Sequence, residues 1–288
     1  MITNRLISTA SMMAAIIGLI ACGGGDTGQV ETPDACQIPA EEAEDCNLGD
    51  VLIQSESDLE ELCQTPCERA DRVRFHSLPN IERLEGLDFI QEIDGQLQIS
   101  HLSNLVEVSM MSELREVGSI AINGNFALEV IEPWEHITEV EGLSFTDARS
   151  LRSVDIVPNL ERIEDEEDSA GIGLTHAHHI EDLSAFRNVE HLDRLGLEFN
   201  DGLESLEGLD SLETVTTVFK LDHNHNMDSL EGAPNLSVVG TGNETWSGGL
   251  AQFKRLPEMT ECEINEFIED LDNDPLEVKI EDVSDEDC

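Results

Sequence analysis

Two short segments hold the histidines best placed to do chemistry. His176 and His178 stand two residues apart in one segment, and His223 and His225 repeat that spacing in the other. Neutral imidazoles bind Zn²⁺ at bond lengths near 2 Å, so divalent-cation binding is one possible function. The pairs occupy equivalent places in a repeat, two coils apart, which separates them by about 10 Å. We therefore favour solvated turn histidines and predict no cofactor and no metal site.

The acidic segments and the remaining motifs give little support for catalysis. The run Glu164–Asp168 and the segment Asp270–Asp274 could hold calcium weakly. The second of these has Pro275 in place of the glycine of a calcium loop and no glutamate at its twelfth position. The chain has no nucleophile motif, phosphate-binding loop or cysteine–histidine pairing. We predict that the protein is not an enzyme and assign no catalytic residue.

The composition limits the possible partners. The chain has 63 acidic residues against 15 basic ones, a formal net charge of −48. Such a surface repels nucleic acid and anionic lipid, and it favours a solvated monomer. Tyrosine is absent and only two tryptophans occur, so an aromatic-rich binding cleft is not expected.

The N-terminal segment is typical of an exported protein. Arg5 precedes an uncharged run from Leu6 to Ala21, 16 residues long, whereas a membrane-spanning helix needs about 20. The segment ends in Leu19-Ile20-Ala21-Cys22, which resembles the lipobox of bacterial lipoproteins. The resemblance implies removal of residues 1–21 as a signal peptide, lipidation of Cys22 and attachment to the membrane.

A flexible tether is expected after the lipidated cysteine, over residues 22–35, because three glycines follow Cys22. The residue at the second mature position is Gly23 and not aspartate. By resemblance to enteric lipoproteins, this favours the outer membrane of a Gram-negative-type bacterium. Periplasmic and surface-exposed orientations both remain open.

An internal repeat runs through most of the remaining chain. One unit reads apolar-x-apolar, with a third apolar residue six positions after the second. We call the second apolar residue the marker. The markers are Ile53, Phe75, Ile99, Ile122, Phe145, Leu174, Leu197, Leu221 and Phe253, at spacings of 22, 24, 23, 23, 29, 23, 24 and 32. We predict one short parallel strand per unit, about nine in all, stacked into a solenoid with one continuous core.

The remainder of each unit has an apolar residue at every third position. Examples are Leu183, Phe186, Val189 and Leu192; Leu206, Leu209, Leu212 and Val215; and Ile131, Trp134, Ile137 and Val140. Neither a helix nor a flat strand has this period, so it indicates a backbone that coils around an apolar interior. Three residues past the marker, a small, amide or apolar residue should turn inward. The two long spacings predict loops at 164–170 and 240–249.

This pattern resembles the receptor L-domain repeat, a right-handed solenoid related to leucine-rich repeats and found in ectodomains of insulin- and epidermal-growth-factor-type receptors. The stretch LESLEGLDSLETV (203–215), followed by FKLDHNHNM, carries the resemblance most clearly. It extends over residues 49–256, and it differs from leucine-rich repeats in placing the inward turn position three residues past the marker instead of two. The resemblance implies a fold but not a function, because the faces of solenoids bind unrelated partners in different proteins.

Both ends of the solenoid should be covered by helices. Ser57-Asp58-Leu59-Glu60 and Thr260-Glu261-Cys262-Glu263 are capping-box patterns that predict a helix at each end. Val278 and Ile280 suit a closing strand. The predicted organisation is a cysteine-rich N-terminal cap with the first coil (36–72), solenoid repeats (73–259), and a C-terminal cap (260–288).

The repeat also restricts the disulfides. Seven stacked strands separate the two ends by roughly 30 Å, beyond the reach of a disulfide. Cys262 should therefore pair with Cys288. The remaining four pair among themselves, in any of three ways: Cys36, Cys46, Cys63 and Cys67.

The outward face of the strands is the candidate binding surface. Of eighteen outward positions flanking the markers, two are acidic and three are basic. A partner could dock there without desolvating carboxylates, although neutral residues also simply suit stacked strands. The candidate residues are Asn123, Ser144, Thr146, Gly173, Thr175, Gly196 and Glu198. The predicted function is a lipid-anchored, non-enzymatic module that binds a protein or glycan; a passive coat or spacer is the alternative.

Overall fold

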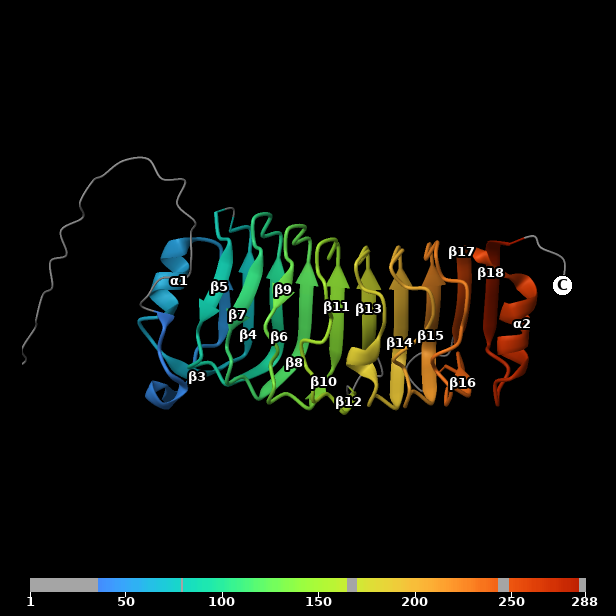
Figure 1. Ribbon diagram of the computed structural model, residues 1–288. Coiled ribbons are helices and arrows are strands. Elements are labelled where there is room, and N and C mark those ends of the chain that lie inside the picture. The colour runs from blue at the N-terminus through green and yellow to red at the C-terminus, as the bar shows by residue number, and fades with distance from the viewer. Residues whose placement is uncertain (1–35, 79, 165–169, 243–248, 285–288) are drawn as a thin grey trace, which may run out of the picture.

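The computed structural model describes residues 36–78, 80–164, 170–242 and 249–284. Ten strands stand side by side in chain order along an elongated parallel β-solenoid (Figure 1). They are β2 (Asp50–Ile53), β4 (Arg72–His76), β6 (Glu92–Ser100), β8 (Glu116–Asn123), β11 (Gly142–Thr146), β13 (Gly171–Thr175), β14 (His191–Glu198), β15 (Thr214–Asp222), β17 (Leu250–Thr260) and β18 (Glu277–Ser284). The stack therefore has ten strands instead of nine, because the predicted closing strand pairs parallel with β17.

The smaller strands complete the coils. The main sheet also includes β1 (Glu44–Asn47), β3 (Cys67–Ala70) and β16 (Val238–Val239). Two further parallel sheets lie in the second half of the units. They contain β5 (Arg83–Gly86), β7 (Glu107–Met110) and β9 (Val130–Ile131), and β10 (Glu139–Val140) and β12 (Arg162–Ile163). Short 3₁₀ turns are η2 (Ala40–Glu42) and η3 (Ser184–Phe186).

Every predicted marker lies beside the marker of the next coil. Phe145 on β11, for example, pairs with Ile122 on β8 and with Leu174 on β13. The register between β11 and β13 is continuous although this unit is six residues longer than its neighbours. The extra residues therefore leave the stack unchanged. Most of the two predicted loops, 164–170 and 240–249, lies outside the described residues, because residues 165–169 and 243–248 are not described.

The period of three has a simple backbone origin. The N–H of Phe186 donates to the carbonyl of Leu183, and the N–H of Val189 donates to that of Phe186. Each apolar residue thus closes a turn onto the preceding one, and successive turns bring the same face inward. The apolar residues of the three series quoted above are all buried. The predicted coiling around one core is confirmed.

One helix lies at each end of the solenoid: α1 (Glu56–Leu62) and α2 (Glu261–Glu269) (Figure 1). The box predicted for α2 is present, with Thr260 and Glu263 as its members. The box predicted at Ser57 is wrong, because the N-cap is Ser55 and its partner is Asp58. Strand β2 ends at Ile53, which leaves Ser55 as the residue at the turn into the helix and places Ser57 inside the first turn. Neither described helix is long and apolar enough to cross a membrane.

Candidate functional site

The predicted binding residues form two parallel rows on the main sheet. Just before the markers, Ser144 pairs with Gly173, which pairs with Gly196. Just after the markers, the pairing continues along Asn123, Thr146, Thr175 and Glu198. The parallel register stacks equivalent residues, so the predicted face is one contiguous surface.

A shallow hollow of about 410 Å³ lies over the middle of this face. Glycines at 142, 171, 173 and 196, together with Ala121 and Ser144, leave the space that larger side chains would fill. Of the predicted residues, Ser144, Gly173, Gly196 and Glu198 line the hollow, whereas Asn123, Thr146 and Thr175 lie beside it in the adjoining row. The sequence predicted the face but not its concavity.

Charge on the face is balanced by ion pairs between neighbouring strands. Lys220 on β15 pairs with Glu198 on β14, and Lys254 on β17 pairs with Glu281 on β18. The third and last lysine of the chain, Lys279, also lies on β18 and pairs with Glu277. Towards the C-terminal end, the face is therefore neutral because its charges are paired, and not because charges are missing.

A ridge of left-handed residues borders the face. The residue two positions after the marker has a positive φ in nine successive coils. These residues are Ser77, His101, Gly124, Asp147, His176, Phe199, His223, Arg255 and Asp282. Only glycine adopts this conformation without cost, and asparagine, aspartate and histidine are enriched among the exceptions. Sequence reasoning missed the ridge, although Gly124 and Asp147 were a weak signal.

Three rings stack along this ridge. The Phe199 ring lies between His176 and His223, with centroid distances of 4.6 Å and 4.1 Å. Nδ1 of His176 is 3.5 Å from Oδ1 of Asp147, and Nδ1 of His223 is 2.6 Å from Oδ1 of Asp222. Each end of the stack therefore faces a carboxylate.

Asp201 lies between the other two histidines. Its Oδ2 is 3.7 Å from Nδ1 of His178, and its Oδ1 is 2.8 Å from Nδ1 of His225. Burial raises the pKa of Asp201, but hydrogen bonds from His225 and the charges of His225 and His178 lower it more, so the pKa lies below its ordinary value of 3.8.

The positions of these histidines argue against a shared metal site. Phe199 separates His176 from His223, and Asp201 separates His178 from His225, in agreement with the two-coil separation predicted from the repeat. In the part of the chain that the structure describes, no three histidine, cysteine, aspartate or glutamate side chains are grouped so that they could hold a metal ion.

We expect His225→Ala to raise the pKa of Asp201 towards 3.8. A lowered carboxylate pKa stabilises the fold above the unfolded pKa, and this contribution is lost as the pH falls through the folded pKa. The variant should therefore be less stable than the parent at pH 7, and the difference should shrink below about pH 4. Carboxyl carbon NMR titration and urea unfolding at both pH values measure these effects. His179→Ala, an exposed imidazole outside this group, is the control; an unchanged Asp201 pKa in His225→Ala contradicts the assignment.

A second hollow, of about 680 Å³, is lined by residues from the N-terminal parts of β6 and β8 and from β10. Arg115 lines it together with five carboxylates, and sequence reasoning did not find it. The carboxylates are Asp94, Glu116, Glu139, Glu141 and Glu164. Asp94 and Glu116 lie on the paired strands β6 and β8, before the apolar-x-apolar motif from which these strands were predicted.

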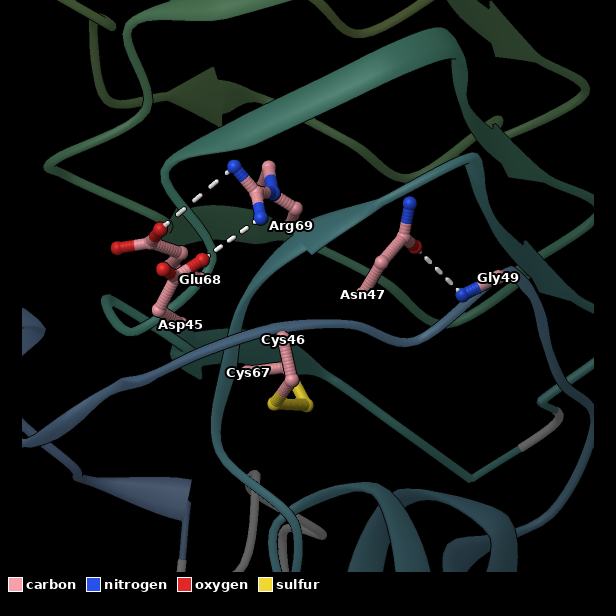
Figure 2. Close-up of a disulfide and its surroundings, with 7 residues drawn as sticks. All are labelled: Asp45, Cys46, Asn47, Gly49, Cys67, Glu68 and Arg69. Atoms are coloured by element: carbon pink, nitrogen blue, oxygen red, sulfur yellow. Dashed lines mark hydrogen bonds and ion pairs between the residues drawn. A yellow bond between two sulfur atoms is a disulfide. The ribbon is translucent and has the colours of Figure 1, made fainter.

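The cysteines of the N-terminal end pair among themselves, as predicted. The structure selects Cys36–Cys63 and Cys46–Cys67 from the three possible pairings. Figure 2 shows Cys46 and Cys67 joining β1 to β3, near the ion pair between Asp45 and Arg69.

Two cysteine predictions reach beyond the described residues. Cys262 is disulfide-bonded, and its predicted partner Cys288 lies outside the described range, as does Cys22. The Cys262–Cys288 pairing and the lipidation therefore stay predictions. No protein-family model matches the chain, and the comparisons with curated proteins and with solved structures gave no match.

Proposed function

We propose that the protein is a lipid-anchored envelope module that binds a protein or glycan partner on its strand face and performs no catalysis. The observation that carries the proposal is the hollow over Ser144, Gly173 and Gly196. It lies at the centre of a neutral surface on a chain with a net charge of −48. A partner can approach this surface with little electrostatic repulsion and few carboxylates to desolvate.

The anchor and the fold type support display of this face at the outer membrane. The lipobox-like segment ending at Cys22 would attach the N-terminal end, so that the coils project away from the bilayer. The repeat favours the right-handed receptor L-domain type. We also propose that α1 and α2 act as caps, since Leu59, Leu62 and Ile264 are buried and Phe267 packs against Phe219 and Phe253.

The test adds charge to the hollow and its border. We expect Ser144→Asp combined with Thr175→Asp to abolish partner capture, because a partner that fits a neutral face would have to desolvate two new carboxylates. Stability should fall by less than about 1 kcal/mol at each site, the range for an unfavourable cross-strand pair. The measurement is crosslinking on intact cells followed by identification of the attached species.

The matched control places the same two changes at exposed positions away from this face, Ser153→Asp and Thr138→Asp. Capture should persist in this variant. Equal capture by both double variants contradicts the strand-face proposal. If neither the parent nor the control captures a partner above background, a passive coat or spacer becomes the better explanation.

A further inference from the structure

Strand β18 ends the main sheet, so one of its edges has no described strand beside it, and α2 lies at the same end of the solenoid (Figure 1). Strand β18 pairs with β17 along one side, and no other described strand pairs with it (Figure 1). Val278 on this strand is 40% exposed, and Leu276, the residue just before the strand, is 60% exposed. An open edge with exposed apolar side chains can be extended by another strand.

The backbone of β18 shows which groups reach the open edge. The N–H of Glu277 donates to the carbonyl of Gly249, so it points towards β17. Backbone groups alternate sides along a strand, and the N–H and C=O of Val278 and Ile280 therefore point away from β17. Val278 is thus positioned to exchange two hydrogen bonds with an identical residue across a two-fold axis.

The sequence of this edge is self-complementary about Val278. The segment reads Leu276-Glu277-Val278-Lys279-Ile280, an order of apolar, acidic, apolar, basic and apolar residues. In an antiparallel pair centred on Val278, Glu277 lies opposite Lys279 of the second copy, and Leu276 lies opposite Ile280. Opposite charges then meet on one face of the paired strands and apolar side chains meet on the other.

We propose that two copies of this chain associate by antiparallel pairing of their β18 edges around Val278. A two-fold axis makes each contact occur twice, as in most small homo-oligomers. Charged residues on edge strands usually prevent pairing. Here their order opposes that effect, because every charge in the segment meets its opposite in this register.

The pairing should be weak and should depend on salt. Five residues on each side bury far less than the roughly 1,200 Å² of a stable interface. Each copy also carries a net charge of −48, and this repulsion is screened as the ionic strength rises. A monomer at low salt, as the composition predicts, is therefore compatible with a dimer at high protein concentration and high salt.

The test is sedimentation equilibrium of the full chain in a non-ionic detergent matched in density to the buffer, so that only protein mass registers. We expect the mean mass to move from one chain towards two with increasing protein and salt concentration. Glu277→Lys should abolish this increase, because lysines would face lysines, and Lys279→Glu should do so by facing glutamates. The double variant Glu277→Lys with Lys279→Glu should restore it.

The control for net charge is Glu258→Lys, an exposed position on β17 outside the segment. It should associate at least as well as the parent. Circular dichroism establishes that each variant is folded, as expected for exposed positions. A parent that stays monomeric at all salt concentrations overturns the proposal, and so does a double variant that fails to recover association lost in both single variants.

Discussion

Replacing Asn224 by alanine should lower the free energy of unfolding by about 2–5 kcal/mol. The Asn224 amide is fully buried; its Oδ1 accepts from the N–H of Asn200, and its Nδ2 donates to the carbonyl of Leu197. Removal of the amide leaves both backbone groups buried without these partners, at about 1–3 kcal/mol each. Urea unfolding measures the loss, and hydrogen exchange should show faster opening at the Asn200 amide.

Two further variants separate hydrogen bonding from packing. Asn224→Leu fills the site, and leucine occupies the equivalent buried position at Leu102 and Leu256, yet it should destabilise nearly as much as alanine. Asn235→Ala removes an exposed amide that donates to the carbonyl of Asp210 and should cost less than about 0.5 kcal/mol. If the leucine variant is as stable as the parent, the side chain at position 224 stabilises the fold by its packing and not by the hydrogen bonds of its amide.

The buried residues at the position of Asn224 in successive coils show what the sequence could predict. Spacing alone predicted an inward-turned residue three positions past the marker. The seven residues of this prediction are all buried: Leu102, Asn125, Ala148, Ala177, Asn200, Asn224 and Leu256. The spacing did not predict that Asn125, Asn200 and Asn224 each bond to the chain of the adjacent coil. A repeat relates equivalent positions, but a hydrogen bond also depends on the distance between coils, which only the assembled stack sets.

On the strand face, too, the sequence predicted which residues are neighbours but not the shape of the surface that they form. Alternation along each strand and the regular unit length placed Ser144, Gly173 and Gly196 side by side. The hollow above them depends on several neighbouring units having small residues at once. The left-handed ridge escaped prediction because Phe199 and Arg255 adopt positive φ against their own preference. There the stacked coils override local propensity, as tertiary context often does.

The N-terminal end illustrates a boundary error. The capping pattern at Ser57 predicted the right helix with the wrong first residue, since two serines precede the same acidic run. The end of β2 decides between them, and strand ends are the least certain feature of a pattern. The length of the solenoid reduced the number of possible disulfide pairings to three. The selection of Cys36–Cys63 among them depends on the folded structure of the N-terminal end.

The second large effect is expected for Gly208→Ala, which should lower stability by on the order of 3 kcal/mol or more. Gly208 has a φ of +102°, and an added Cβ would lie 2.2 Å from the amide nitrogen of Ser184 on the preceding coil. A strained conformation costs about 1–3 kcal/mol, and overpacking adds a similar amount. The coil cannot simply shift away, because the N–H of Leu183 donates to the carbonyl of Glu207 at 2.7 Å.

Gly196→Ala is the matched control for this change. An added Cβ there would find its nearest neighbour, the carbonyl oxygen of Ile172, at 4.0 Å, and alanine is no worse than glycine in a strand. We expect a free energy of unfolding within about 0.5 kcal/mol of that of the parent. Partner capture should be weaker, because the methyl group would enter the hollow. Equal stability of the two alanine variants would contradict the close coil-to-coil contact at Gly208, whereas a destabilised Gly196→Ala would show that the hollow serves packing and not access.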